Sequence, residues 1–352
     1  MIAQRFDARR ATPEGDPAAV TGNIRFSTDA NRVEASAGAD LLVYGLWPHD
    51  RRLVWVDRQG RETGTLGPVA DYEDVRISPA GDRVAVSIRN PEESWNLDVW
   101  VVDVGRGVGS RVSTERSDEF HPVWTPDGQR LIYVSDRNGF YDLYARPAGG
   151  GPETEVIRTD WDKRASGVTP DGAGLVFGGS TSGENEDVWL MALDGDRTLK
   201  PVIETKEFQE VSSRLSPDGR WIAFMSNESG RPEVFVAPFP SGPKRPVSNG
   251  GGGVPVWSRD GKEIFYVGRD GRLFAVPVNA AGAGLEIGAP QPLFVLDSAP
   301  ANQFDPAIYD VSADGRFLVV RSMGESSADP VVVDVDWTAR LGSNAGKGKG
   351  SQ

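Results

Sequence analysis

One short motif recurs along the chain, and it constrains the fold more than any other feature. A serine or threonine is followed by proline or a substitute, then by Asp-Gly and an apolar run, as in Thr125-Pro126-Asp127-Gly128 and Ser216-Pro217-Asp218-Gly219. Proline presets φ, the aspartate side chain bonds nearby backbone, and glycine adopts positive φ, so each copy predicts a β-hairpin turn. Seven copies, the first of them degenerate, begin at residues 36, 78, 125, 169, 216, 258 and 312.

The spacing of these copies identifies the repeating unit. Successive copies lie 42 to 54 residues apart, which matches one four-stranded propeller blade. A strand with a central aromatic residue follows each hairpin, as in Asp98-Val99-Trp100-Val101, and a short fourth strand such as Lys200–Ile203 closes the unit. The sequence therefore predicts an all-β fold, a β-propeller of four-stranded antiparallel blades. Seven blades are expected, with six as the alternative, and seven copies in phase disfavour a β-sandwich.

The two ends of the chain are expected to share one blade. The last hairpin, Ala307–Arg321, supplies inner strands, and residues 1–20 resemble the outer strands of a blade. A third strand is also offered by Asp329–Val335, so the sequence leaves open which end is displaced. We predict a single domain over 1–340, in which 1–20 close the ring and 21–340 form the successive blades. Residues 341–352, rich in Gly, Ser and Lys, read as a flexible tail.

Composition excludes several classes of function. The formal net charge of −13 disfavours nucleic acid and anionic membranes as partners. There is no cysteine, no apolar run of membrane-spanning length and no signal peptide at Met1–Asp7. Kinase motifs and a G-x-S-x-G elbow are missing, and the only histidines are His49 and His121. We expect no catalytic residue, metal ligand or cofactor, although the many carboxylates leave Ca²⁺ open.

A candidate binding site appears seven residues before each motif. This position holds Asp in five of seven repeats, and it falls in the loop that enters the innermost strand, near the mouth of the central channel. One interpretation is that each aspartate caps its turn; the other is an acidic mouth that binds a ligand. With neighbouring aromatic residues and one histidine, the candidate site residues are Asp29, Asp71, Tyr72, Asp118, His121, Trp161, Asp162, Phe208 and Asp305.

The hairpins and the aromatic third strands resemble the TolB-type propeller repeats, which also occur beside serine peptidases of the prolyl-oligopeptidase class. The segments 51–67, 216–240 and 259–278 are similar to the C-terminal propeller of many bacterial Ser/Thr protein kinases. The resemblance implies a non-enzymatic sensor or docking domain of a larger protein, outside the cytoplasm. Its partner would be a protein, a peptide or a small molecule at the channel mouth. A substrate-gating propeller of a hydrolase and a propeller lyase are the alternatives, and we expect a monomer.

Overall fold

The computed structural model describes residues 50–89, 96–181, 183, 185–205, 207–281, 284–296 and 308–323, and the backbone of seven short strands outside these ranges. The chain divides into two compact units, 1–49 with 324–352 and 50–323. The predicted tail and two candidate residues, Asp29 and Asp305, lie outside the described residues.

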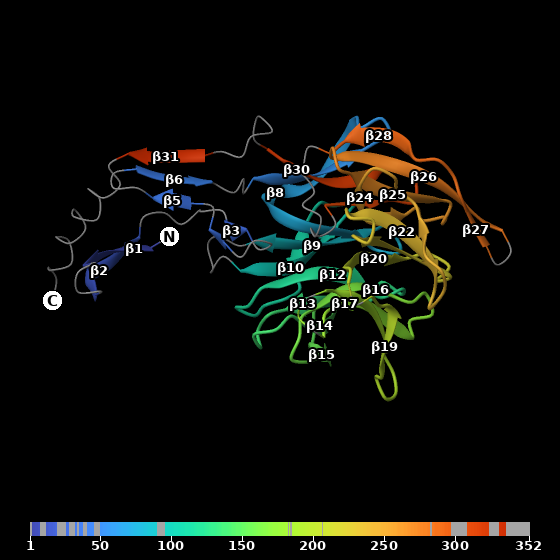
Figure 1. Cartoon of the computed structure of the whole chain (residues 1–352), viewed down its shortest axis with the longest axis horizontal. Helices are drawn as coiled ribbons and strands as arrows, with labels where there is room; N and C mark the ends of the chain where they lie inside the picture. The colour runs from blue at the N-terminus through green and yellow to red at the C-terminus, as the bar shows by residue number, and fades with distance from the viewer. Residues whose placement is uncertain are drawn as a thin grey trace. The chain divides into compact units, whose positions relative to one another are not determined.

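Residues 50–323 form a β-propeller, as predicted. Every described element of this unit is a strand, and the sheets follow one another along the chain in Figure 1. Four sheets of four or five strands come from consecutive segments, and one seven-stranded sheet combines the two ends of the unit. The strands are β7 Arg51–Val56, β8 Glu62–Ile77, β9 Arg83–Arg89, β10 Leu97–Asp103, β11 Gly109–Arg111, β12 Glu119–Trp124, β13 Arg130–Ser135, β14 Asp142–Pro147, β15 Thr154–Ile157, β16 Lys163–Val168, β17 Gly174–Gly179, β18 Asp187–Ala192, β19 Leu199–Ile203, β20 Glu210–Leu215, β21 Trp221–Ser226, β22 Glu233–Pro238, β23 Arg245–Pro246, β24 Gly252–Trp257, β25 Glu263–Gly268, β26 Arg272–Ala281, β27 Gly284–Ile287, β28 Gln291–Val295, β29 Tyr309–Val311 and β30 Phe317–Ser322.

The long strand β8 belongs to two blades. Its first part pairs with β7, and its second part, from Asp71 to Ile77, pairs with β9. Blade 1 is therefore the second part of β8 with β9, β10 and β11, and blades 2, 3 and 4 are β12–β15, β16–β19 and β20–β23. Blade 5 contains β24, β25, β26 and β28, with β27 paired to the far end of β26, and blade 6 contains β29, β30, β7 and the first part of β8.

The ring closes with six blades. The innermost strands contact one another in the order β8, β12, β16, β20, β24, β29 and back to β8. The count of seven is therefore corrected to the alternative of six for this unit. The degenerate first hairpin, at residues 36–44, instead contributes β5 (Ala35–Ala37) and β6 (Leu41–Gly45) to the other unit, where β6 pairs with β31 (Val331–Val335).

The closing blade joins both ends of the ring, but its outer strands are not residues 1–20. Strand β30 pairs with β7 in a register that places Leu318 opposite Trp55 and Val319 opposite Val54. Strands β1 (Ile2–Asp7) and β2 (Thr12–Ala19) pair with each other, as do β3 (Phe26–Ser27) and β4 (Arg32–Val33). The physical reason why β7 takes the place next to β30 is packing, because Trp55 of β7 lies in an apolar cluster shared by blades 6 and 1.

The hairpin turns have the predicted chemistry. In Ser216–Gly219, the Ser216 hydroxyl donates to Asp218 Oδ1 at 2.6 Å, and the Gly219 N–H donates to the Ser216 carbonyl at 2.9 Å. Gly219 has a φ of 68° and Gly128 a φ of 66°. Both glycines thus occupy the left-handed region in which other residues are strained.

Candidate functional site

The topology of the blades defines the face that carries the candidate site. In a four-stranded antiparallel blade, the loop between the second and third strands lies at the same end as the link to the next blade. These loops therefore gather on one face of the ring, which we call the linker face, and the Asp-Gly hairpin turns lie on the opposite face. The linker face includes the loops 113–118, 136–141, 158–162, 207–209 and 227–232.

Two of the predicted aspartates hold the links between blades. Asp118 Oδ1 accepts the Leu97 N–H at 2.8 Å, and Asp162 Oδ1 accepts the Tyr141 N–H at 2.8 Å. Leu97 begins β10 and Tyr141 directly precedes β14, so each carboxylate ties the link to the third strand of the blade behind it. This geometry favours a structural role for the repeated aspartate. Its carboxylate binds the backbone at the third strand of the preceding blade and not the backbone of its own turn.

Asp71 and Tyr72 belong to the core instead of an open mouth. Tyr72 is fully buried, its hydroxyl donates to the Pro68 carbonyl at 2.9 Å, and burial raises its pKa to about 12. Asp71 is also buried, and its Oδ1 lies 4.0 Å from Arg51 Nε. Both residues join blade 6 to blade 1.

Trp161 closes blade 3 from the linker face. Its ring lies 6.2 Å from that of Phe177 and 5.9 Å from that of Trp189, and Lys163 Nζ lies 4.9 Å from the ring centroid. A Cβ atom at Gly179 would stand 2.3 Å from the indole, so only glycine fits beneath it. The half-buried Trp161 thus acts in packing.

His121 lies at the start of blade 2 and is held by blade 1. Its backbone N–H donates to Asp74 Oδ2 at 3.0 Å, and its ring Nδ1 lies 3.7 Å from Asp74 Oδ1. Ser87 Oγ also donates to Asp74 Oδ2, at 2.8 Å. Burial lowers the pKa of His121 to about 4, so the imidazole is neutral at pH 7. The φ of His121 is 51°, at a bulge in β12.

An aromatic patch beside His121 extends the site. The Phe120 ring lies 5.0 Å from the His121 ring and 5.2 Å, edge-on, from Tyr141. The Arg164 guanidinium stands 5.4 Å from the Tyr141 centroid and pairs with Glu186. Phe140, next to Tyr141, is 43% exposed. Phe140 and Tyr141 are not among the residues that the sequence predicted for the site. Their signal was two adjacent aromatic residues in a second-to-third-strand loop.

Phe208 lines a hollow over blade 4. The hollow has a volume of about 440 Å³ and is formed by the link that enters the blade and by the loop between its second and third strands. Its lining residues are Glu207, Phe208, Gln209, Met225, Asn227, Gly230, Arg231 and Pro232. The hollow was not predicted, because its two walls lie about 20 residues apart in the sequence and meet only in the folded blade.

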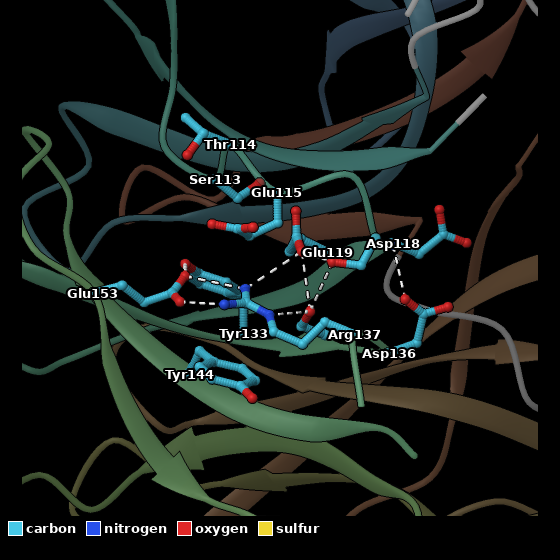
Figure 2. Close-up of polar contacts among 12 residues, drawn as sticks. Ser113, Thr114, Glu115, Asp118, Glu119, Tyr133, Asp136, Arg137, Tyr144 and Glu153 are labelled. Carbon is cyan, nitrogen blue, oxygen red and sulfur yellow. Dashed lines mark hydrogen bonds and ion pairs between the residues drawn. The ribbon is translucent and has the colours of Figure 1, made fainter. Parts of the chain in front are cut away.

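A buried carboxylate network runs through blade 2 (Figure 2). Glu119 is fully buried and accepts the Ser117 hydroxyl at 2.5 Å and the Ser135 hydroxyl at 3.0 Å. Arg137 stands between two carboxylates, with Nη2 3.4 Å from Glu119 and Nη1 2.5 Å from Glu153. Burial raises the pKa of Glu119 to about 7 against the opposing effect of these partners.

The described part of the chain offers neither a metal-binding cluster nor a membrane-spanning helix. No group of three or more His, Asp or Glu side chains there is placed to hold a metal ion. None of the described residues belongs to a helix long and apolar enough to cross a membrane.

Comparison with known proteins gives distant relatives, and no family model matches the chain. An uncharacterised protein of Agrobacterium fabrum is 24% identical over 210 residues, with 55% of this chain and 69% of that protein covered. A TolB homologue of Chlorobium luteolum is 24% identical over 159 residues, with 34% and 36% covered. An uncharacterised peptidase of Bacillus subtilis is 21% identical over 197 residues, with 45% and 30% covered. The chain therefore spans about a third of the length of the last two proteins.

Solved structures agree on the fold. A putative TolB from Agrobacterium tumefaciens superposes with a TM-score of 0.60 at 17% identity, over 78% of this chain and 99% of that one. TolB from Acinetobacter baumannii gives a TM-score of 0.50 at 18% identity, over 84% and 79%. The fold thus places the chain among the β-propellers. Its fold resembles that of these two TolB propellers.

Proposed function

We propose that this propeller is a non-catalytic binding domain that holds a partner protein or peptide on its linker face. The observation that carries the proposal is that the linker face holds two features, the hollow at Phe208 over blade 4 and the exposed Phe140 with the patch of Phe120, Tyr141 and His121 on blade 2. Exposed aromatic residues and depressions on one face are typical of protein-binding surfaces. The TolB-like fold is consistent with such a role.

The wider setting belongs to the same proposal. The resemblance of the repeats to kinase-associated propellers favours a sensor or interaction domain of a larger signalling protein, located outside the cytoplasm. Two measurements in the native host test this setting. One is the size of the intact gene product, and the other is the cell fraction, cytoplasmic or not, in which the product is found after lysis. A kinase domain in the intact product supports the sensor role, whereas a hydrolase domain would favour a gating propeller.

Peptide display tests the binding function directly. A random peptide library is selected on the immobilised whole chain, and the affinity of each selected peptide is measured by fluorescence anisotropy. Peptides should lose roughly tenfold or more in affinity for Phe140→Asp or Phe208→Ala, as anchor contacts do. The matched control is Val108→Asp, because Val108 is 61% exposed at the turn between β10 and β11, on the hairpin face.

Two results would argue against the proposal. Selected peptides that bind both linker-face variants as tightly as the parent chain place the binding surface elsewhere. Turnover in a panel of peptidase and lyase substrates, abolished by His121→Ala, would replace binding by catalysis.

A further inference from the structure

We propose that the hollow over blade 4 binds an apolar group that lies next to a positive charge. Its natural occupant is then a segment of a partner in which an aromatic or aliphatic residue neighbours lysine or arginine. This inference rests on the proposed function and deepens it, because it assigns the chemistry of the segment that the linker face holds.

The floor of the hollow is apolar. Met225 is buried at 2% exposure, and the half-buried Phe208 and Pro232 stand beside it. Gly230 contributes no side chain, and no atom lies within 4 Å of the position that a Cβ atom would take there. A volume of about 440 Å³ lies in the range that accepts a ring or a branched side chain. Methionine sulfur and an aromatic ring both make favourable contacts with such a group.

Glu207 places a negative charge on the rim of the hollow, and the described cations Arg231 and Lys244 are bound by other carboxylates. Arg231 is bound by Glu233, with Nε 2.7 Å from Oε1, so its charge is matched within the blade. Lys244 is bound by Glu228, and its Nζ also lies 3.7 Å from Glu210. Glu207 is exposed on the rim, and among the described residues none forms an ion pair with it.

This combination selects for charge as well as for shape. An apolar floor favours any hydrophobic group, whereas the Glu207 carboxylate favours a cation and repels an anion. A cation on the occupant can also approach the face of the Phe208 ring. The acidity of the whole chain, with a formal charge of −13, acts in the same direction.

Methionine methyl NMR on the whole chain provides a local test. The four methionines are at positions 1, 191, 225 and 323, and loss of one signal in Met225→Leu assigns the methyl group in the hollow. Met191, buried at 1% in blade 3, is the internal reference. The probes are phenethylamine and 3-phenylpropionate, which share a ring and a linker and differ in the sign of their charge.

Phenethylamine should shift the Met225 signal saturably, leave Met191 unmoved and bind about fivefold more tightly than 3-phenylpropionate. Glu207→Gln should remove most of this preference, and added salt should weaken it. The matched control is Glu204→Gln, since Glu204 is exposed three residues away and does not line the hollow.

Equal binding of the two probes, or an unmoved Met225 signal, overturns the inference. Peptides from the display experiment that still bind the linker face would then show that the proposed function stands without it. Conversely, charge-selective binding of phenethylamine in a chain that selects no peptide supports the inference while the proposed function fails.

Discussion

Glycines of the hairpin turns share a backbone conformation but differ in what surrounds them. Gly172 and Gly219 end the same Pro-Asp-Gly motif and have φ values of 76° and 68°. A Cβ atom at Gly219 would lie 2.9 Å from Pro170 Cδ, in the turn of the preceding blade, whereas nothing lies within 4 Å of one at Gly172. Each substitution therefore carries backbone strain, and only the one at Gly219 adds a clash.

Alanine at these two positions separates the two effects. Gly172→Ala should lower the free energy of unfolding by about 1 kcal/mol through strain alone. Gly219→Ala should cost a further ~1–3 kcal/mol, because Pro170 must move. Urea denaturation measures both values, and Gly64→Ala, with a negative φ and open surroundings, is the control. Equal losses at 172 and 219 would show that the turns do not pack against each other.

Glu119 should make stability depend on pH. Its folded-state pKa of about 7 lies above the ordinary 4.5, so the folded chain binds this proton more tightly than the unfolded chain. The stabilisation that Glu119 contributes is therefore full below pH 4.5, and it falls as the pH rises from 4.5 through about 7. Between roughly pH 5 and pH 8, the free energy of unfolding of Glu119→Gln should rise by about 1–3 kcal/mol relative to that of the parent chain. Parallel pH profiles would contradict this, and the exposed Glu115→Gln is the control.

At the scale of the elements, polar groups buried at the strand ends hold the blades together. Lys163 at the start of β16 and Asp142 at the start of β14 are both buried, with Nζ 2.8 Å from Oδ1. Asp142 Oδ1 also accepts the Thr159 N–H at 3.2 Å, in the link between blades 2 and 3. This ion pair therefore connects two blades through the link that joins them.

Removal of one partner tests this connection. Lys163→Met should lower the free energy of unfolding by about 3–5 kcal/mol, because it leaves the Asp142 carboxylate buried without its cation. Adding Asp142→Asn should restore much of the loss. Lys262→Met is the matched control, since Lys262 is 78% exposed and lies 3.8 Å from Asp260, so its loss should be under about 1 kcal/mol. If Lys163→Met behaves like the control, the ion pair does not hold the blades.

At the scale of the whole molecule, ring closure depends on the pairing of β30 with β7. These strands are more than 250 residues apart and pair over their full length. Residues 50–323 should therefore fold alone with one cooperative transition, whereas a fragment that begins at residue 58 lacks β7 and leaves the edge of β30 open. Circular dichroism and calorimetry of the two fragments measure this difference. A shorter fragment that melts like the longer one would show that β7 does not close the ring.

The sequence predicted the fold and the repeat but only part of the candidate site. Phe208 lines the hollow and His121 adjoins the aromatic patch, and a binding role for either residue stays a prediction. Asp118 and Asp162 instead hold the links, and Asp71 and Tyr72 are buried. A shared phase in the repeat places these residues at equivalent points of the blades, but it does not show whether a side chain turns toward solvent or back to the backbone.

The sequence by itself determined the turns, the strands and the four-stranded unit, because Pro, Asp and Gly act on backbone within a few residues of themselves. Only the tertiary structure decided which strand follows β30. Two apolar segments, Leu53–Val56 and Val331–Val335, match the pattern of a third strand. The choice between them depends on tertiary packing: Trp55 lies in the apolar cluster shared by blades 6 and 1, and Arg316 of blade 6 stands 4.9 Å from the Trp55 ring. Such a fit joins segments far apart in the chain, so no local pattern contains it.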